Sequence, residues 1–281
     1  VHGREFDGRF GSRRLTRGVV VVSGKDDYYN RSKQQGYRSR ASYKLKQLDS
    51  EATLFETGDT VVDLGAAPGG WLQVAAEAVG ETGTVVGVDL QRIDDFDAHD
   101  VETIRGDMTD ERTRHYLREA VGEAGADVVV SDMAPNMTGE YDLDHARSVH
   151  LARQALAVAE ELLAPGGDFV VKVFQGRDLE GLRESVADGF EYVQTVSPPA
   201  SRDASSEVYL VAKGRLTATV AVGDRLTVTV DERGDEGDGI AYVDGYTLFV
   251  PGATPGETVS VVVEDVKPRF GFASRAESTG E

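Results

Sequence analysis

Short apolar runs alternate with longer amphipathic stretches between residues 61 and 212, and this alternation constrains the fold more than any other feature of the chain. The runs have the length of β-strands, whereas the stretches between them have helical periodicity and end at glycine or at Pro-Gly. Strands that alternate with helices predict an α/β fold with a doubly wound, mostly parallel sheet. We expect seven strands, at residues 60–64, 84–89, 102–105, 127–131, 168–174, 191–196 and 207–212. We expect helices at residues 70–79, 111–124, 144–163 and 179–187.

The composition changes after Gly214, where valine, threonine and glycine become frequent. Short alternating runs follow one another between Gly-Asp and Pro-Gly turns, at residues 218–222, 225–230, 239–243, 246–250 and 258–266. Five such strands predict a small β-barrel of OB-like size. The chain therefore divides into a flexible N-terminal tail at residues 1–25, an α/β domain at 26–213 and a barrel at 216–275. An alternative start of translation lies near Val22, in which case residues 1–21 are an upstream extension rather than a functional arm.

The charge of the chain is unevenly distributed. Lys and Arg number 30 against 49 Asp and Glu, a net charge of −19, yet residues 1–50 carry a net charge of +7 and residues 51–281 one of −26. Only 7 of the basic residues are lysine. An ordinary acidic surface explains the sign of the charge, but the scarcity of lysine favours a protein adapted to concentrated salt.

Cysteine is absent from the sequence, which excludes disulfides, thiolate zinc sites, cysteine-ligated iron–sulfur clusters and cysteine nucleophiles. No apolar run approaches the roughly 18 residues of a membrane span, and no secretory leader is recognisable. We therefore expect a cytoplasmic protein that does not enter a membrane.

A glycine-rich segment, Asp-Leu-Gly-Ala-Ala-Pro-Gly-Gly-Trp at 63–71, follows the first expected strand. Ala67 stands where the second glycine of a dinucleotide-binding loop would meet a pyrophosphate, so the segment favours an adenosine ligand without one. Asp89 ends the second strand, where a carboxylate can accept hydrogen bonds from a ribose diol, and Asp107 follows the third, where it can bind an adenine amino group. The structural alternatives are a bare strand-to-helix turn and two helix-capping aspartates.

Charged residues occur at the ends of the later strands, where a parallel sheet places its ligands. Asp132 follows the fourth strand, Lys172 lies inside the apolar fifth, and Glu207 opens the last. A lysine is costly to bury, so Lys172 is either a proton acceptor or the partner of Asp132 in a structural ion pair. Lys44 lies on an expected helix within the basic N-terminal part.

Four separate motifs resemble the FtsJ/RrmJ-type ribosomal RNA 2′-O-ribose methyltransferases. They are Arg-Ser-Arg-Ala at 38–41, the glycine-rich segment at 63–71, Ser-Asp-Met-Ala-Pro-Asn at 131–136 and Val-Lys-Val-Phe-Gln-Gly at 171–176. The resemblance covers about residues 26–213 and implies a Rossmann-like fold that binds S-adenosylmethionine (SAM). It places the family's catalytic tetrad on Lys44, Asp132, Lys172 and Glu207, with Lys172 as the proton acceptor. It places the SAM contacts on Gly69, Trp71, Asp89, Asp107 and Asp132. The C-terminal barrel is similar to the TRAM module, which binds RNA.

The resemblance implies methylation of the ribose 2′-hydroxyl of a uridine in large-subunit ribosomal RNA by a monomeric enzyme. Two alternatives remain open, methylation of a tRNA anticodon loop and a catalytically silent RNA-binding assembly factor. Base N-methylation is disfavoured, because the segment after Asp132 lacks the aromatic ring on which such enzymes stack a base. A nicotinamide oxidoreductase is disfavoured by the missing second glycine. The resemblance also implies an RNA-facing helix, whose basic residues are Arg31, Lys33, Arg38, Arg40, Lys44 and Lys46.

Overall fold

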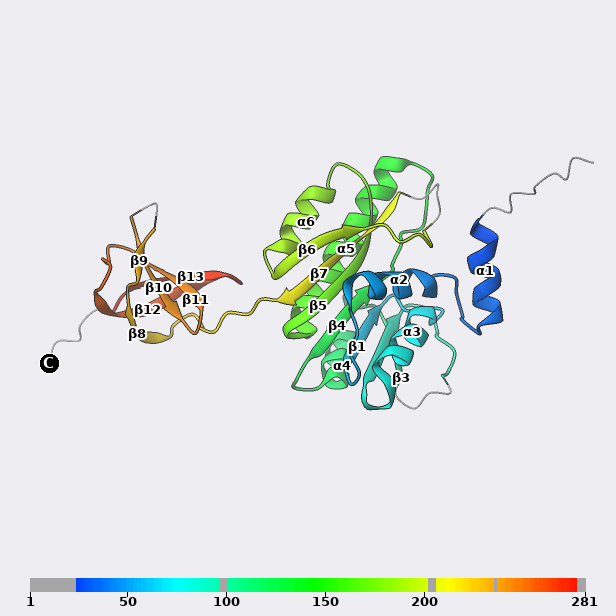
Figure 1. Ribbon diagram of the computed structural model, residues 1–281, viewed down its shortest axis with the longest axis horizontal. Helices are drawn as coiled ribbons and strands as arrows, with labels where there is room; N and C mark the ends of the chain where they lie inside the picture. The colour runs from blue at the N-terminus through cyan, green and yellow to red at the C-terminus, as the bar shows by residue number, and fades with distance from the viewer. Residues whose placement is uncertain (1–23, 97–100, 202–205, 235–236, 277–281) are drawn as a thin grey trace, which may run out of the picture.

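The computed structural model describes residues 24–96, 101–201, 206–234 and 237–276, which form an α/β unit followed by a small barrel (Figure 1). The tail expected at residues 1–25 lies outside the described residues except for Gly24 and Lys25, which begin the first helix, α1. Among the described residues, no helix combines the length and the apolar character that crossing a membrane requires.

Seven strands form the sheet of the α/β unit, in the order β3-β2-β1-β4-β5-β7-β6. The pairs between β3 and β5 are parallel, whereas β7 is antiparallel to both of its neighbours. The seven expected strands are all present, at Thr60–Leu64 (β1), Thr84–Asp89 (β2), Val101–Arg105 (β3), Ala126–Ser131 (β4), Leu163–Phe174 (β5), Phe190–Val196 (β6) and Glu207–Arg215 (β7). The doubly wound, mostly parallel fold is confirmed.

Six α-helices are described, at Gly24–Gln34 (α1), Ser42–Ala52 (α2), Gly70–Val79 (α3), Glu111–Val121 (α4), Tyr141–Leu162 (α5) and Leu179–Ala187 (α6), with a 3-10 turn (η1) at Gly80–Thr82. The helix expected at 111–124 ends three residues early, because Gly122 takes a φ of +68° that does not continue a helix. The helix expected at 144–163 begins earlier, at Tyr141, and ends at Leu162.

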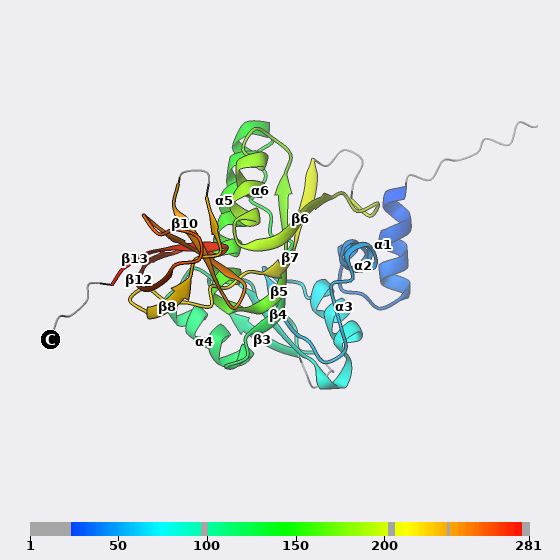
Figure 2. The same ribbon diagram turned by 60° about the vertical axis from the view of Figure 1, so that its left-hand side comes forward.

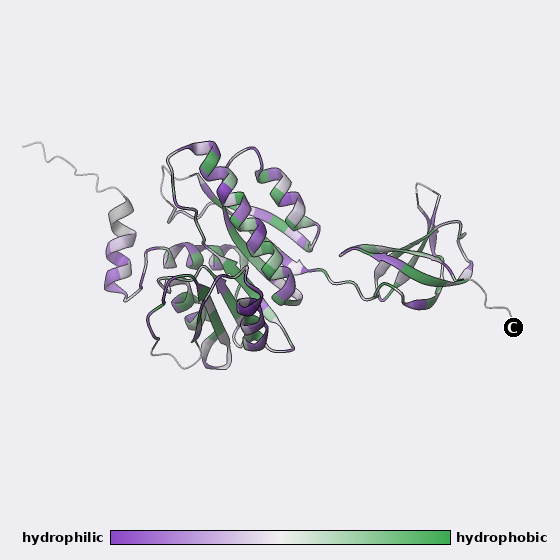
Figure 3. Ribbon diagram, turned by 180° about the vertical axis from the view of Figure 1, so that it is seen from behind, coloured by the Kyte–Doolittle hydropathy of each residue, from purple (hydrophilic) through white to green (hydrophobic). Residues whose placement is uncertain are grey.

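Two apolar cores lie on the two faces of this sheet. Helices α4, α5 and α6 pack on one face through Leu117, Leu156 and Leu182. Helices α2 and α3 pack on the other face through Leu45 and Leu72. Figure 3 shows the strands mostly in the hydrophobic colour, between helices that carry both colours. Helices cover both faces of the central strands, so successive side chains of these strands are buried on one face or the other. The central strands therefore appear in the sequence as continuous apolar runs.

The C-terminal unit is a mixed six-stranded sheet in the order β8-β12-β13-β11-β10-β9. Strands β11 and β13 pair in parallel, and the other pairs are antiparallel. Its strands are Arg225–Thr229 (β8), Glu232–Arg233 (β9), Gly239–Val243 (β10), Tyr246–Val250 (β11), Thr258–Val266 (β12) and Phe270–Arg275 (β13). Strand β8 also lies against β10, so the sheet curls around an apolar core of its own that includes Leu248 and Val261. The small barrel expected from the sequence is confirmed.

The expected strands of the barrel need three corrections, and the first is the two-residue strand β9, which was not expected. The run at residues 218–222 is not a strand, because the Asp224 carboxylate accepts a hydrogen bond from the backbone of Ala221 (2.8 Å) and forms a turn there. Val220 is nevertheless buried in the barrel core. The last strand, β13, was not expected, since Gly271 interrupts its apolar pattern; its backbone lies close to Leu248 and to the Asp265 carbonyl, where a side chain would not fit.

The barrel is attached at the edge of the sheet opposite the carboxyl ends of the parallel strands. Strand β7 begins at that carboxyl edge with Glu207 and, being antiparallel, ends at the opposite edge with Arg215 (Figures 1 and 2). The chain then passes the turn before β6, where the backbone N–H of Leu216 donates to the carbonyl of Gly189 (2.9 Å). Arg269, before β13, donates to the carbonyls of Phe190 and Ala187 in the same region.

Candidate active site

Four charged side chains meet at the carboxyl edge of the sheet. Lys172 of β5 lies 2.8 Å from Asp132, which directly follows β4. Lys44 of α2 lies 2.7 Å from Glu207 of β7 and 3.8 Å from Asp132. These distances join Nζ atoms to carboxylate oxygens, and all four side chains are largely buried, with 6–19% of their surface exposed. The structure thus brings together the four residues that the sequence predicts as a tetrad, in a cluster whose two positive and two negative charges balance.

Asp132 is the hub of this cluster. Its Oδ1 accepts hydrogen bonds from Lys172 and from the hydroxyl of Tyr209 (2.6 Å), and its backbone carbonyl accepts a second one from Lys172. Burial acts to raise the pKa of Asp132, but the ammonium groups of Lys172 and Lys44 outweigh burial and hold the pKa below its ordinary value. The carboxylate is therefore charged at neutral pH and fixes the position of the Lys172 amine.

Tyr209 is a member of the site that the sequence analysis missed. It is fully buried, and burial followed by the charges of Asp132 and Glu207 raises its pKa well above the usual value, so the phenol keeps its proton. Its ring lies 5.9 Å from that of Trp71 and 5.7 Å from the Lys44 Nζ. A signal was present, because residues two apart on a strand share a face and Tyr209 is two residues after Glu207.

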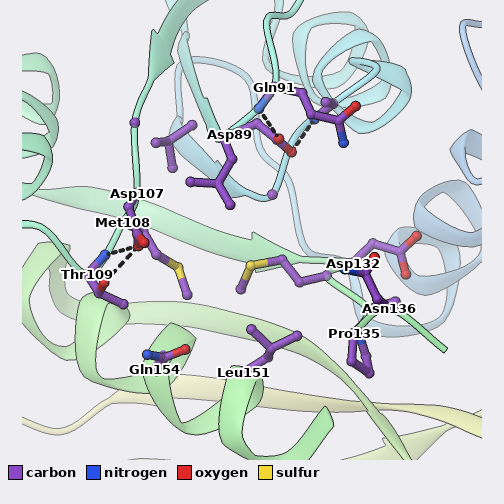
Figure 4. A pocket seen from close by; sticks show the side chains of 17 residues that line it. Asp89, Gln91, Asp107, Met108, Thr109, Asp132, Pro135, Asn136, Leu151 and Gln154 are labelled. Atoms are coloured by element: carbon purple, nitrogen blue, oxygen red, sulfur yellow. Dashed lines mark hydrogen bonds between the residues drawn. The ribbon is translucent and has the colours of Figure 1, made fainter. Parts of the chain in front are cut away.

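A cavity of about 590 Å³ adjoins this cluster (Figure 4). Asp132 lines both the cavity and the tetrad. Asp89 ends β2 and Asp107 lies on the loop after β3, and Leu151 and Gln154 of α5 lie across the cavity from them (Figure 4). Its volume is that of an ordinary ligand pocket. Three carboxylates along its walls favour a ligand rich in hydroxyl and amino groups.

Asp89 and Asp107 also organise the walls of the cavity. Asp89 accepts hydrogen bonds from the backbone N–H groups of Ala67 (3.0 Å) and Gln91 (2.7 Å), so it joins the glycine loop after β1 to the loop after β2. Asp107 accepts hydrogen bonds from the backbone and the hydroxyl of Thr109, and these lower its pKa. The structural and the ligand-binding interpretations of both aspartates are thus compatible, because each carboxylate has further lone pairs for a ligand.

Gly69 and Trp71, the other two predicted cofactor contacts, do not line this cavity. Gly69 precedes α3 with a φ of +102°, which favours glycine. Trp71 is buried in the core between α2, α3 and the sheet, and its indole N–H donates to the Ala41 carbonyl (2.8 Å). Their contact with a cofactor stays a prediction.

Asp63 is a second site residue to which the sequence analysis gave no role. Only 1% of its surface is exposed, and its Oδ2 has no hydrogen-bonding partner among the described residues. Burial, followed by the charges of Asp132 and Asp89, raises its pKa well above the ordinary value. A buried carboxylate oxygen without a donor fits a bound ligand that carries an ammonium group or another strong donor.

The predicted RNA-facing basic residues divide into two groups. Arg31 and Lys33 are exposed on α1. The others make internal contacts: Arg38 with the carbonyls of Asp94 and Asp95, Arg40 with the carbonyl of Ala200, Lys46 with Tyr37 and Glu77, and Lys44 with Glu207. Among these six residues, four therefore make contacts within the domain and two face solvent.

The strand order, with an antiparallel seventh strand inserted beside β5, and the charged cluster next to a carboxylate-lined cavity define a Rossmann-like methyltransferase. The family model for FtsJ-like methyltransferases matches residues 37–215, and the model for the TRAM domain matches residues 219–275. The chain therefore belongs to the FtsJ-like methyltransferase family and carries a C-terminal TRAM domain. The family implies a methyl donor as cosubstrate.

Curated relatives match almost the whole chain. A protein of Halorubrum lacusprofundi named ribosomal RNA large subunit methyltransferase E is 79% identical over 256 residues, which span 91% of this chain and 95% of that protein. A protein of the same name from Natronomonas pharaonis is 68% identical over 91% of this chain and 100% of its own length. A crystal structure from Plasmodium falciparum, provisionally named a ribosomal RNA methyltransferase, is 27% identical with a TM-score of 0.58, over 65% of this chain and 100% of that one.

Proposed function

We propose that this enzyme transfers a methyl group from SAM to the ribose 2′-hydroxyl of a uridine in large-subunit ribosomal RNA, as a cytoplasmic monomer. One observation carries the proposal: Asp132 lines the donor cavity and also binds Lys172, 2.8 Å away. The donor and the group that accepts a proton are therefore neighbours, as a transfer to a weakly acidic hydroxyl requires.

The cavity fits SAM in size and in charge. Asp89 accepts hydrogen bonds from the ribose hydroxyls, and Asp107 binds the adenine amino group. Gly69 and Trp71, which do not line the cavity, stay predicted contacts of the cofactor. Asp132 lines the cavity and favours the ammonium group of the methionine, and the unpartnered Asp63 oxygen lies buried in β1. SAM supplies a methyl group already activated on a sulfonium, so the protein has only to align the acceptor and to remove its proton.

The tetrad residues then have separate tasks. Lys172, as a neutral amine, takes the proton of the 2′-hydroxyl while the oxygen attacks the methyl group. Asp132 orients Lys172, helped by the hydrogen bond from Tyr209 (2.6 Å). Lys44 holds the substrate ribose or phosphate, and Glu207, 2.7 Å from Lys44, balances its charge. While Lys172 is neutral the cluster carries one net negative charge, and the proton taken from the 2′-hydroxyl restores the balance of two positive and two negative charges.

Ribosomal RNA as the substrate is supported by the names of both haloarchaeal relatives and by the TRAM domain. We also propose that the catalytic unit spans residues 26–213 and the barrel 216–275, which the matched ranges 37–215 and 219–275 support. The basic residues left exposed, Arg31 and Lys33, are those that meet RNA phosphates.

Methyl transfer from radiolabelled SAM to purified large subunits, to free large-subunit RNA and to tRNA, in concentrated KCl, tests this proposal. We expect transfer to the large-subunit substrates and none to tRNA. Lys172→Ala and Lys172→Arg should both abolish transfer while the chain still binds S-adenosylhomocysteine, because an arginine keeps the positive charge but not the ability to accept a proton. Transfer to tRNA alone would support the anticodon-loop alternative. RNA binding without any transfer would support the silent assembly factor.

A further inference from the structure

Arg38 lies on the connection between α1 and α2, and its side chain contacts two loops at the rim of the donor cavity. Its Nη1 donates to the Asp94 carbonyl (2.7 Å) and its Nη2 to the Asp95 carbonyl (2.6 Å). Its guanidinium carbon lies 3.7 Å from the centre of the Phe96 ring. Nη1 also donates to the carbonyl of Pro68 in the glycine loop (3.4 Å). One planar cation therefore joins the segment after β2 to the loop after β1.

The backbone of Arg38 is fixed to helix α3 by Gln73. The Gln73 side chain accepts a hydrogen bond from the Arg38 backbone N–H (2.8 Å) and donates one to the Gly36 carbonyl (3.1 Å). Helix α3 therefore fixes the backbone of Arg38, and the carbonyls of Asp94 and Asp95 fix its guanidinium group.

The contact reaches the glycine loop directly at Gly69. A Cβ atom at Gly69 would lie 2.8 Å from Cζ of Phe96 and 2.9 Å from Nη1 of Arg38. Real Cβ atoms do not approach other atoms so closely, so Arg38 and Phe96 occupy the space above the Gly69 backbone. Arg38 and Phe96 thus pack against Gly69, a residue that we expect to contact the donor.

The two loops joined by Arg38 form one side of the donor cavity. Gly65 and Ala67 line it from the loop after β1, and Asp89, Leu90 and Gln91 line it from the end of β2 and the loop after it. The separation of these loops sets the width of the cavity on that side. Among the described residues, one other side chain links the loop after β1 to this segment. It is Asp89, which accepts a hydrogen bond from the backbone N–H of Ala67.

We propose that Arg38 is a positioning residue for the methyl donor rather than an RNA contact. It holds the segment of Asp94, Asp95 and Phe96 against the glycine loop, and so gives the cavity the shape that SAM requires. This inference rests on the proposed function, because it takes SAM as the donor. It also explains why the position is an arginine: a lysine ammonium cannot reach two carbonyls in one plane and stack on a ring at the same time.

Calorimetric titration of the full chain with S-adenosylhomocysteine, without RNA, tests the proposal. We expect Arg38→Lys to weaken binding by about tenfold, since it loses the fork of hydrogen bonds and the stacking but keeps the charge. Phe96→Leu should weaken binding in the same direction. The matched control is Arg112→Lys on α4, an exposed arginine that lies over the ring of Tyr116, and it should bind as the wild type does. In steady-state methylation, Arg38→Lys should raise the KM for SAM, with kcat at saturating SAM and the KM for RNA changed by less than about twofold.

An unchanged affinity for S-adenosylhomocysteine in folded Arg38→Lys, together with a raised KM for RNA, would overturn the positioning role in favour of an RNA contact. If Arg38→Lys does not fold, Phe96→Leu decides, because wild-type affinity in that variant contradicts the proposal on its own. A wild-type chain that binds no S-adenosylhomocysteine would contradict the proposed function itself, which separates that failure from a failure of the role of Arg38.

Discussion

The carboxyl group of Asp63 is buried close to the charges of Asp132 and Asp89, and the burial, with these charges, raises its pKa well above the ordinary value. In the unfolded chain the pKa of an aspartate is about 3.9. The folded chain therefore keeps this proton to a higher pH, and the free energy of unfolding falls as the pH rises from about 4 toward the folded pKa. The site retains a residue that weakens the fold at neutral pH, which is expected where a ligand supplies the missing partner.

Replacing Asp63 by asparagine should separate these two effects. Asp63→Asn removes the charge at constant size, so we expect a higher free energy of unfolding than in the wild type near neutral pH without donor, and a smaller difference near pH 4. The same variant should bind S-adenosylhomocysteine more weakly, because the ammonium group loses a carboxylate. Urea unfolding at several pH values in concentrated KCl measures the first effect. Glu184→Gln, at an exposed position on α6, is the control and should change neither quantity. An Asp63→Asn chain less stable than the wild type at neutral pH would contradict this account.

The family resemblance carried by the four motifs predicted the tetrad, and the structure brings Lys44, Asp132, Lys172 and Glu207 together at the carboxyl edge of the sheet. The sequence could not predict the partners of Arg38. A basic residue near an RNA-binding helix is expected to face phosphate, and only the folded chain brings the carbonyls of Asp94 and Asp95, more than fifty residues away, within 2.7 Å of it.

Elements of the α/β unit could be predicted because the central strands β1, β2, β4 and β5 are mostly buried and helices α3 and α4 end at a glycine. The barrel elements were harder to predict, since short strands depend on contacts between segments distant in the sequence. The run at residues 218–222 has a strand-like pattern but lacks a neighbouring strand, and Asp224 turns it into a loop. Strand β13 has a neighbour on each side, β12 and β11, although Gly271 weakens its pattern.

A substitution at Gly271 of β13 tests how this strand packs in the barrel. A Cβ atom there would lie 2.8 Å from the Asp265 carbonyl and 3.1 Å from Leu248, beside the irregular register of β12 and β13. We expect Gly271→Ala to destabilise the barrel by about 1–3 kcal/mol through overpacking. The matched control is Gly181→Ala on α6, where a Cβ has open space and should stabilise the helix by about 0.5–1 kcal/mol. Differential scanning calorimetry distinguishes the two, and a Gly271→Ala barrel as stable as that of the wild type would contradict the barrel packing described.

The whole molecule presents the tetrad at one edge of the sheet and the barrel at the other. Strand β7 has nine residues, which at about 3.3 Å each separate Glu207 from the start of the linker by roughly 30 Å. An RNA that occupies both the site and the barrel must therefore span at least this distance.

Arg269 holds the barrel against the α/β unit through the carbonyls of Phe190 and Ala187. We expect Arg269→Ala to raise the KM for large-subunit RNA several-fold, because the barrel is no longer held in one orientation, and to leave the affinity for S-adenosylhomocysteine unchanged. The ratio of KM values on long RNA and on a short target hairpin measures the effect. A variant whose KM rises equally on both substrates would show that Arg269 does not act through the barrel.

The net charge of −19 makes the stability of the whole molecule depend on salt. Repulsion between carboxylates is screened when the Debye length falls from about 8 Å at physiological ionic strength to about 3 Å at 1 M salt. We expect the melting temperature to rise steadily with KCl over this range, and a melting temperature independent of KCl would contradict an adaptation to concentrated salt. Four of the six predicted RNA-facing basic residues make internal contacts, and concentrated salt weakens phosphate attraction, so RNA recognition under such conditions relies on shape more than on phosphate charge.

The chemical position of the transferred methyl group tests the central claim most directly. Large-subunit RNA methylated with labelled SAM is hydrolysed in alkali, which cleaves every linkage except those next to a blocked 2′-hydroxyl, and the products are identified by mass spectrometry. The account predicts that the label appears in an alkali-resistant dinucleotide containing 2′-O-methyluridine, and that Lys172→Arg yields none. Label on a base, or undiminished label with Lys172→Arg, would contradict a ribose methyltransferase in which Lys172 accepts the proton.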